Sequence, residues 1–452
     1  MERFPMNDPW KLSALGQEDP AIAHRLWLAL QSFCAICVFF LLLFTLRLYR
    51  FSYFYLDDFN NLHLTQHASG WSMLWYNTHP STNIFRPVGF LAHWICLHLF
   101  DLSPFPYHLS AWIIHLISVY LVYLILRHAS QNAYSAGLGS LLFAVQISYS
   151  SIFYNFGTTI FDLLAGLFYF LGLWTYIRKG ASKIGLVLAC VIYFLACNSK
   201  EMALTLPGAW MLYELIVNRS MLGPGKWRGS NQRRAIFREL VSLAGRFIFP
   251  SLIALWFVLS KESIVRGTSP SDPYRLHVSP ASMVDGYGWY FNALYETGWP
   301  WTVWMAVAAL LFCLLLLKLN RWGIFFLAYT FLTLLPVVFM TQHRHPHYWY
   351  IPFLGISGLA ALALAPVVRW VRGEMSPRMT AIAGALAFAF FCNQSYFLFK
   401  ELSRFERPWA RDLSEEYRSF ITGLRMLPQP EPDTTVYFRS VPRNFDSTTL
   451  VS

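Results

Sequence analysis

The stretch LWLALQSFCAICVFFLLLFTL, residues 26–46, is an apolar run without an acidic or basic side chain. A helix rises about 1.5 Å per residue, so roughly twenty apolar residues cross the ~30 Å hydrocarbon core of a bilayer. Residues 301–317, WTVWMAVAALLFCLLLL, repeat the pattern. The run at 26–46 is too long for the core of a signal peptide and lacks a small-residue cleavage site. We therefore predict an uncleaved membrane anchor.

The composition of the whole chain agrees with this interpretation. Hydrophobic residues make up 56% of it and charged residues 13%, against about 25% charged in ordinary soluble domains. Apolar runs separated by polar residues predict about eleven spans in an all-α polytopic membrane protein. These spans lie near residues 26–47, 106–126, 134–150, 158–177, 184–197, 202–217, 243–260, 301–317, 322–340, 350–368 and 379–399.

Arginine and lysine concentrate in alternate connections between these spans, around residues 178–183, 218–240, 318–321 and 369–378. Because short loops rich in basic residues stay in the cytoplasm, we place these connections there together with residues 1–25. The opposite loops carry more aromatic, acidic and histidine residues, and we expect them to face outward. The net charge of +11 then reflects inner loops near anionic lipids, which argues against a nucleic-acid partner.

The predicted domains follow from this topology. A transmembrane catalytic domain covers residues 26–399, its first outer loop covers 48–105, and a short extracytoplasmic tail covers 400–452. Within the outer loop, residues 85–101 and 60–75 predict two helices lying in the membrane interface. The tail predicts a helix followed by an extended arm at 434–441. The seven cysteines show no spacing typical of disulfides or zinc, so we expect small core residues.

Asp57 and Asp58, in YLDDFNNL at residues 55–62, follow the first span immediately on the predicted outer face. Two adjacent carboxylates repel each other, and partial desolvation raises the pKa of at least one of them, which favours a general base. The alternative is an ordinary helix start, because aspartate is common at helix N-termini. The local sequence leaves both interpretations open.

A succession of motifs gives a more specific indication. It runs LDDFNNL (56–62), FRPVGFLAHWICLHLFDLSPFPYHLSAWIIH (85–115), NFGTTIFDLLAGLFYFLG (155–172), CNSKEMALTLPGAWMLYE (197–214) and QHRHPHYWYIPFLGIS (342–357). This succession resembles the GT-C superfamily of glycosyltransferases, in particular its protein O-mannosyltransferase-like branch with bacterial relatives. The resemblance covers most of residues 50–360. It implies a GT-C-type bundle, a catalytic base at Asp57 and Asp58, and a polyprenyl-phosphate sugar donor. The chain has no tetratricopeptide array, so the resemblance does not define the acceptor.

The same resemblance assigns roles to cations. Lys200 and Glu201 lie at the outer end of the fifth predicted span, and the resemblance implies that Lys200 contacts the donor phosphate. The alternative is a lysine that extends to the lipid headgroups. Arg344 matches an arginine that precedes a tyrosine-rich stretch, where a guanidinium would clamp the leaving phosphate. Arg86 and Tyr348 are accessory candidates.

Asp162 lies among apolar neighbours at the start of the fourth predicted span. An ionisable side chain in such a place marks a functional site by default. The resemblance implies that Asp162 orients the acceptor or the base. The alternative is a carboxylate favoured by the helix dipole.

The histidines fall into two groups. On an extended segment, His343, His345 and His347 would point to one side, which is compatible with a divalent metal. Several branches resembling this chain work without a catalytic metal, whereas the oligosaccharyltransferase branch needs one, so we predict no cofactor. The histidines of the outer-loop helix and the second span are expected to be packing residues; they are His93, His98, His108 and His115.

We therefore predict an inverting hexosyltransferase in the inner membrane of a bacterium. It would move a sugar from undecaprenyl- or dolichyl-phosphate to a hydroxyl of a protein, glycan or glycolipid, on the extracytoplasmic side. The alternative is a multi-pass lipid or solute transporter or flippase. Transporters place ionisable residues near mid-membrane around inverted repeats. Here the charges collect at the outer ends of the spans, and no internal repeat is evident.

Overall fold

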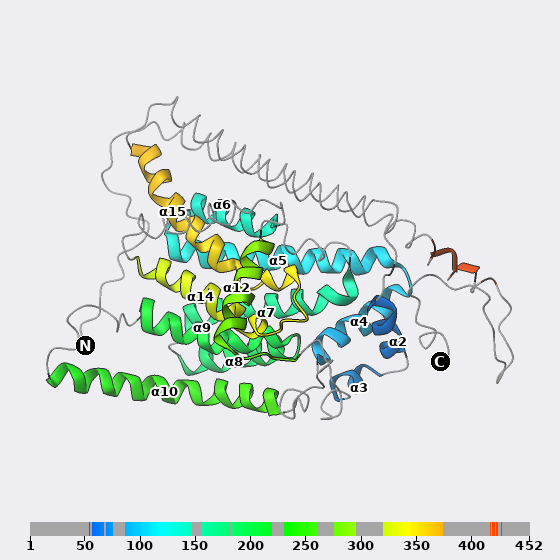
Figure 1. Cartoon of the computed structure of the whole chain (residues 1–452), viewed down its shortest axis with the longest axis horizontal. Helices are drawn as coiled ribbons and strands as arrows, with labels where there is room; N and C mark the ends of the chain where they lie inside the picture. Colours follow the sequence, from blue (N-terminus) through cyan, green and yellow to red (C-terminus); the bar gives the residue numbers. More distant parts are fainter. Residues whose placement is uncertain are drawn as a thin grey trace.

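The computed structural model describes residue 54, residues 57–66, 69–75, 86–146, 155–180, 182–218, 230–259, 275–294 and 320–373, and several residues between 416 and 426. Every regular element in these ranges is a helix, which confirms the predicted all-α class (Figure 1). The predicted spans at 26–47, 301–317 and 379–399 and the arm at 434–441 lie outside the described residues.

In the part of the chain that the structure describes, three helices are long and apolar enough to cross a bilayer: α5 (Pro104–Ser130), α7 (Phe156–Lys179) and α14 (Arg321–Val338). Each coincides with a predicted span. Shorter apolar helices surround them, namely α4 (Pro87–Phe100), α6 (Ala133–Ala144), α8 (Lys183–Cys197), the second half of α10 (Ser230–Leu259) and the first part of α15 (Phe353–Gly373). Together with the composition, these helices make the chain an integral membrane protein.

Two predicted spans differ from the structure. The single helix expected over 202–217 is a succession of a 3-10 helix η3 (Glu201–Thr205), α9 (Leu206–Leu212) and a π-helix η4 (Tyr213–Asn218). Pro207, in the first turn of α9, has no N–H to give to a preceding helix. The helix expected over 243–260 begins earlier, because residues 230–243 are rich in good helix formers.

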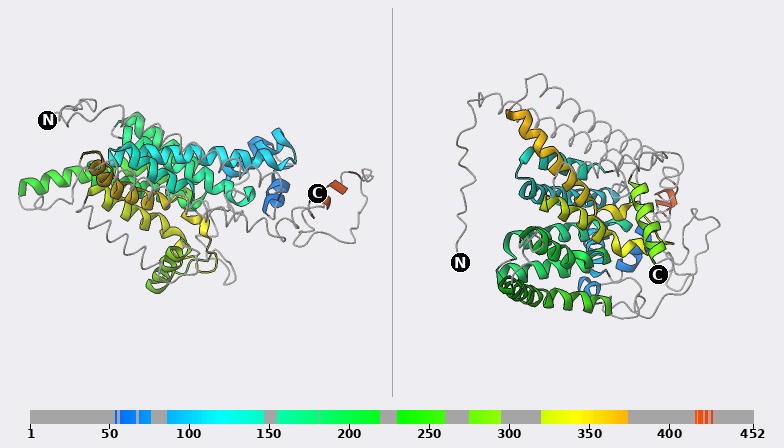
Figure 2. Two further views of the ribbon diagram at one scale, coloured as in Figure 1. Left: turned by 90° about the horizontal axis from the view of Figure 1, so that it is seen from above. Right: turned by 60° about the vertical axis from the view of Figure 1, so that its left-hand side comes forward.

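The first outer loop contributes α2 (Asp57–Gln66), α3 (Gly70–Trp75) and α4. One helix was expected over 60–75, and the structure has two. Gly70, at the start of α3, lies so close to the ring of Trp94 that a Cβ there would be 3.3 Å from it. A further helix that the hydropathy did not indicate, α12 (Pro280–Ala293), lies against α14 and η5 (Pro346–Trp349) on one side of the bundle (Figure 2). Its sequence signal is a capping box formed by Ser279 and Ser282.

The helices alternate in direction, so their ends collect at two poles of the bundle. The outer-loop helices α2 to α4 lie at one pole (Figure 1). There α5, α7 and α15 begin and α8 and α14 end. At the other pole, Asn132 caps α6, Ser182 caps α8 and Asn320 caps α14, and basic residues lie beside these caps. Arg178, Lys183 and Arg321 therefore lie at the pole opposite the outer-loop helices.

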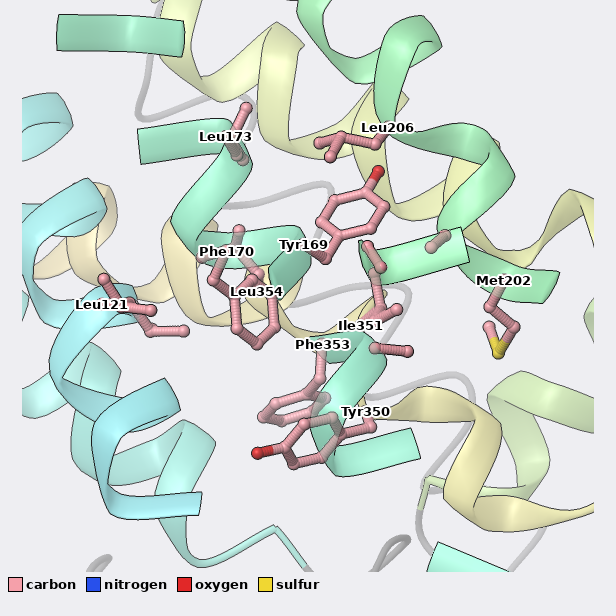
Figure 3. Close-up of a cluster of buried hydrophobic side chains, with 14 of the residues drawn as sticks. Leu121, Tyr169, Phe170, Leu173, Met202, Leu206, Tyr350, Ile351, Phe353 and Leu354 are labelled. Atoms are coloured by element: carbon pink, nitrogen blue, oxygen red, sulfur yellow. The ribbon is translucent and has the colours of Figure 1, made fainter. Parts of the chain in front are cut away.

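In the interior of the bundle, aromatic and aliphatic side chains fill the space between α5, α7, α9 and α15 (Figure 3). Gly166 allows this packing, because a Cβ on it would lie 2.4 Å from the ring of Tyr350. The Tyr169 hydroxyl lies 3.2 Å from the Thr205 hydroxyl, which ties α7 to η3. Cys96, Cys190 and Cys197 are buried thiols, which confirms the predicted packing role for these three cysteines.

Candidate active site

The pole next to the outer loop holds a buried ion pair. Lys200 donates from Nζ to Oδ2 of Asp162 at 2.6 Å, and the two side chains are 5% and 3% exposed. Asp162 lies in the second turn of α7, and Lys200 follows the end of α8, which runs back along α7. A buried charge is very costly unless an opposite charge compensates it, so each of the two residues requires the other.

A second ion pair lies at the same corner of the chain. Arg86, just before α4, donates from Nη2 to both carboxylate oxygens of Glu201, at 3.0 and 3.3 Å. Its guanidinium also lies 5.3 Å from the centre of the Phe161 ring. The backbone N–H of Val88 donates to the carbonyl of Asn198 at 3.0 Å. The start of α4 is therefore fixed to the segment that carries Lys200 and Glu201.

The turn before α15 completes this site. Nζ of Lys200 lies 4.6 Å from the centre of the Tyr348 ring, within the range of a cation–π contact. Nε2 of His347 lies 3.8 Å from Oδ2 of Asp162. Burial lowers the pKa of His347 well below its ordinary value, and the positive charge of Lys200 lowers it further. His347 is therefore a neutral imidazole at neutral pH.

We call this group the charge cluster; it consists of Arg86, Asp162, Lys200, Glu201, His347 and Tyr348. Four segments far apart in the sequence supply it. The sequence singled out each of these residues, but it did not indicate that Asp162 is the partner of Lys200. The predicted topology did contain an indication of this pairing. Residues 180–182 join two antiparallel spans, so the outer end of the fourth span, with Asp162, lies beside the outer end of the fifth span, with Lys200.

The acidic pair of the first loop lies at the start of α2, so its backbone has the helix-start geometry that was the alternative interpretation. The side chain of Asp57 lies outside the described part of the structure. Asp58 is buried against the first turn of α7: a Cβ on Gly157 would lie 2.7 Å from its Oδ1. Asn61 donates to the carbonyl of Gly157 at 2.9 Å. Asp162 is one and a half turns further along α7, about 7.5 Å along its axis.

Arg344 forms an ion pair with a residue of α12. Its Nη2 donates to Oδ2 of Asp285 on α12 at 2.5 Å, with the Asp285 side chain 68% exposed. This ion pair ties the segment before η5 to α12. Arg86 contributes a guanidinium to the corner that holds Lys200.

The alternating histidines form a series of ring contacts. The ring centres of His343 and His345 are 4.4 Å apart, and those of His345 and His347 are 5.1 Å apart and nearly parallel. Within the residues described, no group of three or more histidine, cysteine, aspartate or glutamate side chains is arranged to hold a metal ion. The series ends at Asp162.

Three of the other histidines are buried packing residues, as predicted. His93 packs edge to face on Phe156, with ring centres 4.9 Å apart, and burial lowers its pKa to about 3. Nδ1 of His115 lies 3.0 Å from the hydroxyl of Tyr350, and its other ring nitrogen lies 3.2 Å from the carbonyl of Ala144. His98 is on the exposed face of α4.

The chain matches no protein-family model and no curated protein. Among solved structures it is similar to ArnT from Cupriavidus metallidurans in the apo state, with 14% identity and a TM-score of 0.46 over 78% of this chain and 62% of that one. ArnT from the same organism bound to undecaprenyl phosphate gives 15% identity, a TM-score of 0.46, and coverage of 79% and 64%. This chain thus spans less than two-thirds of the ArnT chains. Likeness at this level carries no function over to it.

Proposed function

We propose that this protein is an inverting glycosyltransferase of the GT-C type, which moves a hexose from a polyprenyl-phosphate donor to an acceptor hydroxyl at the outer face of the membrane. The observation that carries the proposal is the buried Lys200, held at one pole of a membrane bundle by Asp162 and Tyr348. A lysine there suits a phosphate whose lipid tail stays in the bilayer. Arg86, at the same corner, supplies a second cation.

The proposed roles follow from these positions. Lys200 and Arg86 stabilise the negative charge that grows on the leaving phosphate, and Tyr348 positions Lys200. Asp57 is the general base, and buried Asp58 fixes the start of α2 against α7. Asp162 and Glu201 keep the cations in place between turnovers. To bind the phosphate, Arg344 would have to exchange Asp285 and Arg86 would have to exchange Glu201. We assign the second cation to Arg86 because its charge acts directly on Lys200.

The reaction is a single displacement. The acceptor oxygen attacks the anomeric carbon while Asp57 takes its proton, and the bond from that carbon to the phosphate oxygen breaks with its electron pair leaving on the phosphate. One displacement inverts the configuration at the anomeric carbon. Because the phosphate needs no protonation to leave, one base and two cations suffice, unlike the two carboxylates of glycosidases.

A transporter is the competing hypothesis. Transporters hold their substrate near the bilayer midplane, between broken helices. The charged residues of the cluster come from helix ends at one pole, not from the middle of the bundle. This position favours chemistry at the membrane surface.

The direct test is turnover by the purified protein in nanodiscs. Incubation with polyprenyl-phosphate sugars and candidate acceptors should release free polyprenyl phosphate, which thin-layer chromatography detects. Asp57→Asn should abolish the release and leave donor binding intact. The matched control is Asp101→Asn, since Asp101 is exposed and its positive φ of 49° suits asparagine. Near-normal turnover by Asp57→Asn would remove Asp57 from the mechanism, and absence of release by the wild type with every donor would refute the proposal.

A further inference from the structure

The charges of the cluster cancel before any ligand binds. Among its described members, Lys200 and Arg86 are cations and Asp162 and Glu201 are carboxylates, while His347 is neutral. Each cation already has its own carboxylate. The site that must accept a phosphate anion is therefore occupied by protein anions.

An anion that binds there faces a charge problem. A sugar phosphodiester carries one negative charge, so its arrival would leave one uncompensated negative charge among side chains that are only 3–27% exposed. An unbalanced charge in such surroundings is strongly disfavoured. Two solutions exist: a carboxylate leaves the cluster, or a carboxylate takes up a proton.

The surroundings of Asp162 favour the second solution. Asp162 lies in the second turn of α7 and its side chain is only 3% exposed, so we expect its carboxylate to stay within the cluster. The groups that face it are Lys200 and Glu201 from the α8–η3 corner, Arg86 before α4, and His347 and Tyr350 from the turn before α15. Glu201 is 27% exposed, so that carboxylate can turn outward with its charge.

We propose that Asp162 takes up a proton when a phosphodiester binds Lys200, and that His343, His345 and His347 conduct this proton from the outer surface. The inference rests on the proposed function, because it assumes that Lys200 binds the donor phosphate. No covalent bond changes: one proton moves from solvent to a carboxylate oxygen of Asp162, and Lys200 exchanges that oxygen for a phosphate oxygen. The net charge of the occupied cluster returns to zero.

The histidine series provides the route. His343 and His345 are partly exposed, whereas His347 is buried beside Asp162. Successive ring centres are 4.4 and 5.1 Å apart, which allows proton transfer directly or through a bridging water. A neutral imidazole accepts a proton on one nitrogen and releases one from the other, so a series of them conducts protons without holding a charge.

The test is calorimetric titration of the protein in nanodiscs with farnesyl methyl phosphate, a phosphodiester that does not titrate near neutral pH. Comparing the heat in Tris and in HEPES gives the protons taken up per ligand bound. We expect about one proton for the wild type, with affinity rising about tenfold per unit fall in pH, because the bound state holds the additional proton. Asp162→Asn should bind more tightly, take up none and lose the pH dependence.

Glu201→Gln leaves one cation in excess before the ligand binds, so the same charge count predicts that this variant takes up no proton. Infrared difference spectra therefore assign the proton: binding to the wild type should give a protonated-carboxyl C=O band that Asp162→Glu shifts and Glu201→Asp leaves unchanged. His345→Gln should leave the proton count unchanged and slow association measured by stopped flow. Binding by the wild type without proton uptake would overturn this inference and leave the proposed function standing, whereas no binding at all would overturn both. Loss of uptake in His347→Gln, or a carboxyl band that shifts in Glu201→Asp and not in Asp162→Glu, would move the proton to that residue and overturn the assignment to Asp162. Unchanged association in His345→Gln would overturn the route.

Discussion

The contact between α2 and α7 provides a test of how closely the base must be held. An added Cβ on Gly157 would lie 2.6 Å from the backbone nitrogen of Asp58, 2.7 Å from its Oδ1 and 2.8 Å from its Cα. These distances fall roughly 0.6–0.8 Å short of the 3.4 Å at which ordinary contact begins. The atoms met are mainly backbone, so in Gly157→Ala the start of α2, with Asp57, must move away from α7.

A displacement approaching 1 Å at a reacting group can cost about a hundredfold in rate. We therefore expect Gly157→Ala to lower kcat by about tenfold to a hundredfold, with an overpacking cost of about 1–3 kcal/mol in stability. Binding of a prenyl phosphodiester should stay unchanged, because Lys200 and Arg86 are held by other contacts. Release of polyprenyl phosphate measures the first effect and calorimetric titration the second.

The matched control is Gly137→Ala in α6, because a Cβ there meets nothing within 4 Å. This variant should keep kcat and gain up to about 1 kcal/mol in stability, since alanine favours the helix. A folded Gly157→Ala protein with wild-type kcat would refute the argument that the start of α2 carries the base. A loss of phosphodiester binding would show that the glycine acts on the charge cluster instead.

Three further predictions concern individual charges. Lys200→Met should destabilise the protein by about 3–5 kcal/mol, because it leaves Asp162 buried without its cation. In the double variant Lys200→Met/Asp162→Asn, denaturant unfolding should show restored stability, whereas phosphodiester binding should stay lost. Equal instability of the single and double variants would contradict this prediction. Asp285→Asn should change stability by less than about 1 kcal/mol, since the Asp285 side chain is 68% exposed. If Arg344 clamps the phosphate, Asp285→Asn should also tighten phosphodiester binding, and Arg344→Gln should weaken it. His93 has a pKa of about 3 in the folded protein against 6.5 in the unfolded chain, so the unfolded chain binds more protons between these values. The free energy of unfolding therefore decreases as the pH is lowered from 6.5 to about 3. In His93→Gln, the free energy of unfolding should decrease by up to about 1.4 kcal/mol less for each pH unit of acidification. An acid-unfolding curve identical to that of the wild type would contradict this prediction.

The helices were predictable where hydropathy alone decides the structure. The spans at 106–126, 158–177 and 322–340 each coincide with a membrane-length helix, because an apolar run of that length has one favourable arrangement in a bilayer. Prediction was less accurate at 201–218, where Pro207 and a π-helix divide one apolar run into three elements. The helix α12 was missed because its signal is a capping box, not an apolar run.

The site was predictable as a set of residues but not as a set of contacts. An isolated charge among apolar residues is rare enough to indicate Asp162 and Lys200 individually. Their pairing depends on the rotation of α7 relative to α8, which side-chain packing determines and the local sequence does not state. For the same reason the sequence did not indicate that Arg344 pairs with Asp285.

The length of α8 also bears on the lipid around the protein. Its 15 residues extend about 22 Å, less than the ~30 Å hydrocarbon thickness of an average bilayer. A membrane next to so short a helix must thin, or the corner after it must lie below the level of the surrounding headgroups. Since Val88 is bonded to Asn198, α4 follows that corner to the same depth. The acyl-chain length of the host membrane therefore determines how far a lipid-borne phosphate must descend to reach Lys200.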